Sequence, residues 1–431
     1  MMSTTSAKPL NIVIVGAGIG GLTTAVALRQ AGHRVQVFEA AENKAEIGAG
    51  LGLQANSLRA VLSLGAKQEN LRGFEWNGVT IFDAATGERM RASQPLNIPQ
   101  HGLTSRGCHR ADVYNELRRL ATDEEDKRGP PVEIHLGFKV TSCDPTAGTI
   151  ELANGSVIKG DLLIGGDGVH SIVRESVLGK VVPAEPSGWA VYRCSFDASS
   201  LGNGSEIDWV LNNATNVRMM TGPFSELIIY PIRDKTLINF AAFHPDAERD
   251  PTQRLCPSFS CASFARKLTR MPALARVVSK EAVFADFAHY DPLFMRFFDL
   301  PLVTQIVDWK LRTLPVLPTW IKNRAVIIGD AAHAMLPLLA SGAAMAIEEG
   351  VALGILFPLG TTPEQVPARL EAFQALRKER GDFVSTESTA QIQRENRNQM
   401  AARFRQIVEY DVVQATREYL KTAEIGGVAA A

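Results

Sequence analysis

The residues of this sequence best suited to chemistry are glycines and carboxylates that directly follow apolar runs. The first group is the turn at residues 16–21 (GAGIGG), which follows the apolar run at 10–15, while Glu39 closes the next alternating run. Glycines in such a turn let the backbone approach a phosphate, and a carboxylate at this spacing accepts hydrogen bonds from ribose hydroxyls. The pattern therefore predicts a site for the ribose and diphosphate of a dinucleotide.

Each glycine of this turn has a separate predicted task. Gly16 makes the tight turn itself, Gly18 lets the backbone approach the diphosphate, and Gly21 allows the following helix to pack closely on the strand. The start of that helix also offers N–H groups and the positive end of its dipole to the phosphates. A glycine-rich loop without a ligand is the alternative, which the strand–turn–helix context disfavours.

Two later segments repeat the arrangement of an apolar strand followed by glycine and aspartate. Residues 161–174 (DLLIGGDGVHSIVR) contain Asp167 and Gly168, and residues 324–349 contain Asp330. Carboxylates at strand ends can bind cofactor hydroxyls, but simple capping of the turn is the alternative for both aspartates.

Together the three motifs resemble those of the group A flavoprotein monooxygenases, which have the para-hydroxybenzoate hydroxylase fold. The chain is most similar to their salicylate hydroxylase-like branch, which is common in fungal secondary metabolism. The resemblance extends over residues 10–385 and implies an FAD cofactor. It implies that FAD is bound by Gly16, Gly18, Gly21, Glu39, Gly52, Arg110, Asp167, Gly168, Asp330, Pro337, Gly342 and Ala343.

The resemblance also implies the reaction. NAD(P)H would reduce FAD, O2 would form a flavin C4a-hydroperoxide, and one oxygen atom would pass to an aromatic, phenolic small molecule. Because no second GxGxxG motif is present, we expect NAD(P)H to bind transiently as a cosubstrate. One alternative is an epoxidase or hydroxylase of an indole, alkaloid or polyketide. A more remote alternative is a protein that uses the FAD fold for binding without redox chemistry.

Two residues in the middle of the chain match family positions that face the substrate. Arg193 lies in a segment like the family's A-Y-R strand and would hold a phenolate or carboxylate through paired hydrogen bonds. Tyr230 lies in a segment like the family's H-x-x-x-Y-P strand. The alternatives are a salt bridge for Arg193 and a place in the core for Tyr230. His333, in GDAAH, is a further candidate base, with a purely structural turn residue as the alternative.

The chain departs from the family pattern at two places beside these residues. Glu226 stands where many relatives have histidine, which removes a proton acceptor that titrates near neutral pH. Leu338 and Ser341 stand before Gly342, where close relatives more often have Tyr and Gln. These changes predict a roomier or more apolar pocket and leave the identity of the substrate open.

The elements that must position these residues follow from the hydrophobic pattern. Continuous apolar runs at 10–15 and 324–329 predict buried parallel strands, whereas period-two alternation in the middle of the chain predicts antiparallel hairpins. We therefore predict an α/β fold, a discontinuous Rossmann-like FAD-binding domain of the GR2 type with an inserted mixed or antiparallel substrate sheet and C-terminal helices. The alternating segments are 79–91, 132–143, 148–158, 205–221 and 226–243. The predicted domains are 8–75 with 105–185 and 285–385 for FAD, 76–104 with 186–284 for substrate, and the C-terminal helical segment 386–431.

Charge and cysteine usage narrow the partners. Because 45 basic and 46 acidic side chains give a net charge of −1, we expect no nucleic-acid partner. No run approaches the ~20 apolar residues that span a bilayer, so we expect no stable membrane insertion. Five scattered cysteines without a CxxC pair predict no metal site and fit a reducing, cytoplasmic location. The expected partners are O2 and an aromatic or heteroaromatic small molecule, and the expected state is a monomer or homodimer.

Overall fold

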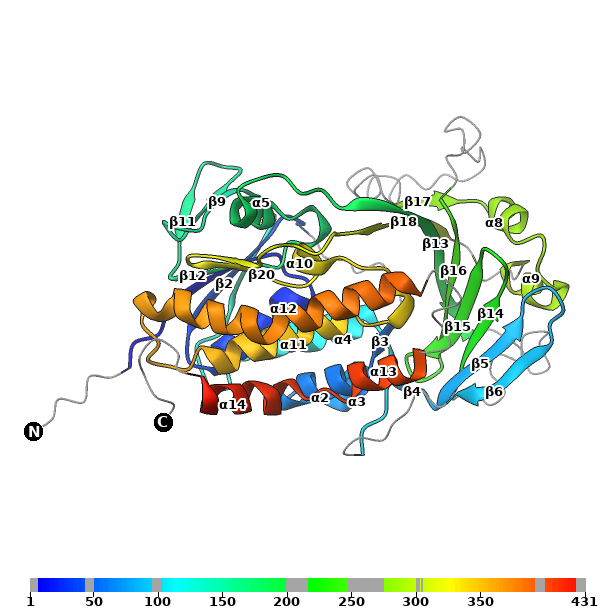
Figure 1. Cartoon of the computed structure of the whole chain (residues 1–431), viewed down its shortest axis with the longest axis horizontal. Coiled ribbons are helices and arrows are strands. Elements are labelled where there is room, and N and C mark those ends of the chain that lie inside the picture. The colour runs from blue at the N-terminus through cyan, green and yellow to red at the C-terminus, as the bar shows by residue number, and fades with distance from the viewer. Residues whose placement is uncertain are drawn as a thin grey trace, which may run out of the picture.

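Two large sheets and a group of helices make up the computed structural model. It describes residues 7–42, 50–94, 102–198, 216–246, 275–299, 303, 305–391 and 400–423. Figure 1 shows the two sheets at opposite ends of the long axis, with the helices α11, α12 and α14 beside the first sheet. Among the described residues, no helix combines the length and apolar character needed to cross a membrane.

The first sheet is parallel and buried, as the apolar runs predict. Its central strand is buried along residues 12–15, and parallel pairing continues through its neighbours on both sides. Only the two-residue strand at one edge runs antiparallel. The order is β19 (Ile321–Lys322), β20 (Ala325–Ile327), β12 (Leu162–Gly165), β1 (Asn11–Val15), β2 (Arg34–Glu39) and β8 (Glu133–Leu136).

Two helices from opposite ends of the chain pack against each other beside this sheet. Helix α1 (Ile19–Gln30) approaches α11 (Gly342–Leu356) so closely that a Cβ atom on Gly354 would lie 2.6 Å from the Cβ atom of Ala27. A Cβ atom on Gly350 would likewise lie 2.8 Å from the backbone nitrogen of Thr24. These glycines bring the two motif-bearing helices together.

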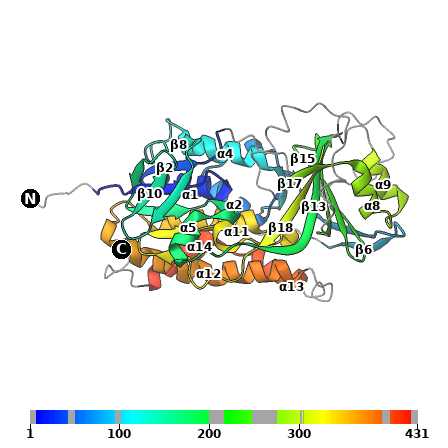
Figure 2. The same ribbon diagram turned by 90° about the horizontal axis from the view of Figure 1, so that it is seen from above.

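The second sheet is antiparallel except at one pair, β14–β5, which is parallel. Period-two alternation separates its faces. One face packs against the phenylalanine-rich helices α8 (Lys280–Asp286) and α9 (Pro292–Asp299), and the other faces the first sheet's side of the molecule (Figure 2). The order is β17 (Ala275–Val278), β18 (Ile306–Thr313), β13 (Glu185–Asp197), β16 (Leu237–Pro245), β15 (Glu226–Ile232), β14 (Asn216–Thr221), β5 (Gly78–Asp83) and β6 (Arg89–Gln94).

The remaining elements join or cover the two sheets. One small sheet has the order β3 (Gly50–Leu53), β7 (Arg106–His109), β4 (Phe74–Glu75), and another has β11 (Val157–Lys159), β10 (Thr149–Leu152), β9 (Val140–Asp144). The helices are α2 (Ala55–Ser63), α3 (Gln68–Leu71), α4 (Arg110–Thr122), α5 (Ile172–Leu178), α10 (Asp330–His333), α12 (Val366–Ala390), α13 (Met400–Val408) and α14 (Val412–Thr422). In the described part of the chain, short 3-10 helices are η1 (Gly168–His170), η4 (Pro337–Leu339) and η5 (Pro363–Gln365).

The predicted fold class is confirmed, with one wrong pairing. The alternation predicts that segment 132–143 belongs to antiparallel hairpins and meanders; β9 does pair antiparallel with β10, but β8 joins the parallel sheet. Local alternation predicts a strand and not its partner, which explains the error. The predicted boundary at 284 also cuts the second sheet, since β18 pairs with β13 and β17, so the domain division stays a prediction. Residues 205–215 of the expected strand 205–221 lie outside the described residues.

Candidate active site

The turn at residues 16–21 uses its glycines in different ways. Gly16 has a backbone φ of +99°, and a Cβ atom there would lie 2.4 Å from the carbonyl oxygen of Gly166. A Cβ atom on Gly21 would lie 2.0 Å from the carbonyl oxygen of Gly16. A Cβ atom on Gly18, in contrast, would meet no heavy atom within 4 Å among the described residues. The fold itself therefore requires Gly16 and Gly21, whereas Gly18 fits its predicted place beside a diphosphate.

Glu39 faces this turn from the end of β2. Its Oε2 accepts a hydrogen bond from the backbone N–H of Ala17 at 2.9 Å, and its Oε1 accepts one from Ala41 at 3.0 Å. A carboxylate has about four acceptor sites, so these bonds are compatible with the predicted contacts to ribose hydroxyls.

The two aspartates that look alike in the sequence have different surroundings. Asp167 accepts hydrogen bonds from Ser171 Oγ at 2.5 Å and from the backbone N–H of Ile172 at 2.8 Å, so it holds the start of α5. Burial raises the pKa of Asp167, although these hydrogen bonds act against the shift. Asp330 is exposed and accepts no hydrogen bond from the part of the chain that the structure describes. The capping alternative thus applies to Asp167, and Asp330 fits a partner outside the protein.

His333 ends the short helix α10 that Asp330 begins, and it joins this turn to α11. Its Nε2 lies 2.7 Å from Oε1 of Glu349, whose Oε2 accepts a hydrogen bond from the backbone N–H of Gly329 at 2.8 Å. Burial opposes protonation of the imidazole, but the carboxylate of Glu349 holds the pKa of His333 above its usual value. Since both side chains are buried, this pair fixes the turn, and the structural alternative for His333 is the better supported one.

The beginning of α11 leaves backbone donors available next to this turn. Ser341 provides no side-chain cap, because its Oγ lies 2.8 Å from the carbonyl oxygen of Leu339 and 3.2 Å from Oε1 of Gln54. The N–H groups of Gly342 and Ala343 have no acceptor within the helix and carry partial positive charge. Pro337 begins η4 just before them. This arrangement suits a ring on which negative charge accumulates.

Gly52 has a structural reason that the sequence pattern does not show. A Cβ atom on Gly52 would lie 2.9 Å from Cη2 of Trp76 and 3.4 Å from the Cβ atom of Ala340. The indole of Trp76 fills this place and lies edge-on to Tyr230, with 5.1 Å between ring centroids. The contact of Gly52 with FAD stays a prediction.

Arg193 lies in the middle of the sheet face that looks away from α8 and α9. It pairs across the sheet with Ala241, which in turn pairs with Ile228. The guanidinium carbon of Arg193 is 5.9 Å from the ring centroid of Trp309, and its Nε is buried with no hydrogen-bond partner among the described residues. Burial lowers the pKa of Arg193. The charge of Arg110 lowers this pKa further, whereas Tyr230 raises it. The structure thus brings the three predicted residues Arg110, Arg193 and Tyr230 together.

Tyr230 is buried on the same face of the sheet as Arg193. It lies on β15, two residues after Ile228, which is in register with Arg193 through Ala241. A Cβ atom on Gly50 would lie 2.4 Å from its hydroxyl oxygen, so the phenol packs against the strand β3. Burial raises the pKa of Tyr230 to about 12, although Arg193 acts against the shift. The phenol is therefore neutral at physiological pH and can donate a hydrogen bond.

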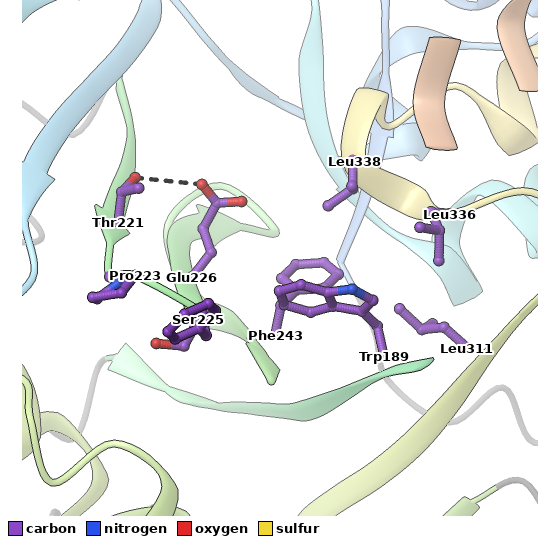
Figure 3. A pocket seen from close by; sticks show the side chains of 11 residues that line it. Trp189, Thr221, Pro223, Ser225, Glu226, Phe243, Leu311, Leu336 and Leu338 are labelled. Atoms are coloured by element: carbon purple, nitrogen blue, oxygen red, sulfur yellow. Dashed lines mark hydrogen bonds between the residues drawn. The ribbon is translucent and has the colours of Figure 1, made fainter. Parts of the chain in front are cut away.

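A pocket of about 280 Å³ opens on this face of the second sheet (Figure 3). Neither Arg193 nor Tyr230 lines the pocket. Val191 lies two residues before Arg193 on the same face of β13, and it packs in the apolar cluster that forms the pocket wall. Two residues along a strand span about 7 Å, so Arg193 adjoins the pocket. The lining residues are Trp189, Thr221, Gly222, Pro223, Phe224, Ser225, Glu226, Phe243, Leu311, Leu336 and Leu338.

These pocket residues were missed at the sequence level, apart from Glu226 and Leu338. The sequence contained a signal for some of them, because residues an even number of positions apart on a strand share a face. Trp189 therefore shares a face with Arg193 on β13, and Glu226 shares one with Tyr230 on β15. For Leu336 and Leu311 we find no local signal, since they come from a loop and from a strand far along the chain.

The residues present fit FAD. Gly18 and Gly168 have open space where a side chain would project, Asp330 is an exposed acceptor, and the start of α11 supplies donors. Arg110, another of the predicted FAD residues, begins α4 and is partly exposed.

Comparisons with known proteins agree with this geometry. The sequence profile of the family described as "FAD binding domain" matches residues 10–254 and 301–388. Hispidin-3-hydroxylase of Neonothopanus nambi is 37% identical over 393 residues, which cover 88% of this chain and 87% of that protein. The FAD-dependent monooxygenase atnJ of Arthrinium sp is 31% identical over 87% of this chain and 82% of its own length. A salicylate hydroxylase substrate complex has a TM-score of 0.74 at 21% identity, covering 96% and 99% of the two chains, and supports the fold.

Proposed function

Because the chain belongs to the FAD binding domain family and is an FAD-dependent monooxygenase, we propose that it hydroxylates a small aromatic molecule with NAD(P)H as reductant. The observation that carries the substrate class is the pocket. Trp189 and Phe243 offer aromatic surfaces, and Leu336 and Leu338 flank Pro337, the residue predicted to lie against the flavin. Aromatic rings pack favourably on aromatic side chains, so a planar substrate suits this wall.

The chain's own residues would position the substrate, exclude water from it and stabilise charge on the cofactor. When bound, FAD would be the group that NAD(P)H reduces and that activates O2. The leucines of the 336–338 loop and the ring of Phe243 exclude water from the substrate's side of the site. Arg193 would orient a polar or anionic substrate group from the neighbouring row of the sheet. The start of α11 would stabilise negative charge on the cofactor ring.

A second function of the same type stays open. The apolar pocket would equally hold an indole, alkaloid or polyketide for hydroxylation or epoxidation. Relatives from fungi support a place in secondary metabolism. The alternative of a non-redox binding protein is no longer supported, since the relatives matched over most of the chain are monooxygenases. The cytoplasmic location and the oligomeric state stay predictions.

The test is a turnover experiment with isotopically labelled O2. Hispidin is the first substrate to try, because a relative named hispidin-3-hydroxylase is 37% identical. We expect the purified yellow protein to oxidise NAD(P)H faster with a suitable aromatic compound, and the product to gain one labelled oxygen atom. Hydrogen peroxide formation without an oxygenated product across a panel of phenols, indoles and polyketides would contradict the proposal.

A further inference from the structure

We infer that Glu226 determines substrate specificity by accepting a hydrogen bond from a hydroxyl or N–H group of the bound aromatic substrate. The inference rests on the proposed function for the location of the substrate, and it adds the chemical class. The preferred molecules carry a hydrogen-bond donor at the edge of the ring system that faces β15, and molecules without that donor are rejected.

The pocket places one carboxylate among mainly apolar groups. Glu226 is the first residue of β15 and only 6% exposed, yet it lines the cavity. Its Oε1 accepts a hydrogen bond from Thr221 Oγ1 at 3.4 Å, a long contact from the neighbouring strand. In Figure 3, Thr221 and Glu226 lie together on one side of the pocket, and Leu336 and Leu338 lie on the other. A substrate between these sides therefore meets a polar edge and an apolar wall.

The turn that carries this polar edge is held in place by hydrogen bonds within the turn and to His289 and Tyr290. The hydroxyl of Ser225 lies 3.0 Å from Nε2 of His289, and the Tyr290 hydroxyl donates to the carbonyl oxygen of Met220 at 3.3 Å. The backbone N–H of Gly222 also donates to the carbonyl oxygen of Ser225 at 2.9 Å. These bonds fix the backbone of both strands at the turn, and the Thr221 hydroxyl bonds the Glu226 carboxylate, so the place of this carboxylate is restricted before a substrate arrives. A preorganised acceptor discriminates better than a mobile one.

The chemistry of a buried carboxylate makes this edge selective. A carboxylate is an acceptor only, and displacing water from it without providing a donor is costly. A phenol or an indole N–H provides that donor, whereas an ether of the same shape does not. Hydrogen bonds to an ionised acceptor are about twice as strong as neutral ones, so the discrimination should exceed that of an amide at the same position. A hydroxyl that donates to a carboxylate also makes its ring more electron-rich, which favours oxygenation.

The experiment compares two ligands with the same fused rings on the FAD-loaded protein; they differ in the O-methyl group that replaces the hydroxyl hydrogen. The probes are 2-naphthol and 2-methoxynaphthalene, whose fused rings suit a pocket of about 280 Å³. Dissociation constants are read from the change in flavin absorbance on titration, without NAD(P)H. We expect the wild type to bind 2-naphthol at least about tenfold more tightly than its ether.

Two variants and a control then isolate the carboxylate. Glu226→Leu should bring the ratio of the two dissociation constants close to one, and Glu226→Gln should give an intermediate ratio. Glu88→Gln, an exposed position in the turn between β5 and β6, should keep the wild-type ratio. If Glu226→Leu does not fold, the intermediate ratio of Glu226→Gln carries the test alone.

The outcomes separate this inference from the proposed function. Equal binding of the two probes by the wild type, binding of neither, or an unchanged ratio in both Glu226 variants would overturn the inference. If the preference exists and is lost as expected, but no aromatic compound gains an oxygen atom with NAD(P)H, the proposed hydroxylation fails and the inference stands. If oxygenation occurs while the ratio is insensitive to Glu226, only the inference fails.

Discussion

At the scale of single residues, equivalent motif positions have different roles in the folded chain. Asp167 and Asp330 each follow a glycine at the end of a parallel strand. The carboxylate of Asp167 accepts hydrogen bonds from Ser171 and from the start of α5, while the exposed Asp330 accepts no hydrogen bond from the described residues. One aspartate therefore contributes to folding, and the other is available to a cofactor.

This difference predicts opposite effects for the same substitution. Asp330→Ala should leave the stability of the apoprotein within about 0.5 kcal/mol of the wild type, because an exposed side chain that accepts no hydrogen bond from the described residues contributes little. It should lose most of the FAD. Asp167→Ala should destabilise the apoprotein by about 1 kcal/mol through the lost cap. Thermal unfolding of the apoproteins and the flavin-to-protein absorbance ratio measure both. Equal destabilisation by the two variants, or full FAD retention by Asp330→Ala, would contradict this assignment.

Arg193 allows a second prediction at this scale. Its buried Nε has no hydrogen-bond partner among the described residues, so its donors fit a substrate group. Arg193→Ala should retain FAD but lower kcat/KM for substrate-stimulated NAD(P)H oxidation by about tenfold or more, as expected for charged hydrogen bonds. Arg89→Ala, at an exposed position in the same sheet, is the control. Unchanged steady-state turnover of Arg193→Ala would show that the anion-binding role is wrong.

At the scale of elements, the contact between β1 and α1 separates folding from cofactor binding. Gly21 lets α1 rest on the turn, since a Cβ atom would lie 2.0 Å from the carbonyl oxygen of Gly16. Gly18 precedes the same helix with φ −76° and ψ −176°, a conformation that any residue adopts. The helix start therefore contains one glycine that packing requires and one that it does not.

The two glycines form a matched pair for mutagenesis. Gly21→Ala should destabilise the apoprotein by about 1–3 kcal/mol or prevent folding, because backbone atoms must move apart. Gly18→Ala should leave apoprotein unfolding unchanged and weaken FAD binding, because its methyl group would point toward the predicted diphosphate. FAD titration of each apoprotein, followed by flavin fluorescence, gives the dissociation constants. Wild-type FAD affinity in Gly18→Ala would argue against the predicted diphosphate position.

At the scale of the whole molecule, buried charges on α11 hold distant parts of the chain together. Glu348 accepts hydrogen bonds from Asn56 of α2 at 2.6 Å and from Arg377 and Arg380 of α12 at 2.5 and 2.8 Å. Burial opposes the ionised form, but Arg380 and Arg377 hold the pKa of Glu348 below its usual range. The next residue, Glu349, binds His333. Adjacent carboxylates on one helix thus hold both helix α12 and the Asp330 turn.

The buried His333–Glu349 pair makes stability depend on pH. Since the pKa of His333 is raised in the folded protein, its contribution is fully present below the unfolded value of about 6.5 and is lost as pH rises through the folded value. We expect the melting temperature of the FAD-loaded protein to fall on that alkaline side. His333→Gln should remove this part of the pH dependence, and His170→Gln, at an exposed position, should retain it. A melting profile with the same pH dependence in all three proteins would refute the linkage.

The framework of the predicted FAD site and the class of fold could be recognised from the amino-acid sequence alone. Turn conformation and strand burial are local properties, so Gly16, the run at 10–15 and the return of a buried strand at 324–329 could be recognised from residue types and spacing. The family pattern added FAD and monooxygenation. Both are supported by relatives that match over most of the chain.

Which of the predicted residues meet, and which side chains surround them, depends on long-range packing. The pocket forms where β13, β15, β16 and β18 align with the loop at 336–338, and strand register between distant segments is not encoded in any local pattern. Long-range packing also gave Asp167 its capping role, moved β8 into the parallel sheet and placed Trp76 over Gly52. It brought Glu226, which the sequence marked as the loss of a histidine, to the polar edge of the pocket.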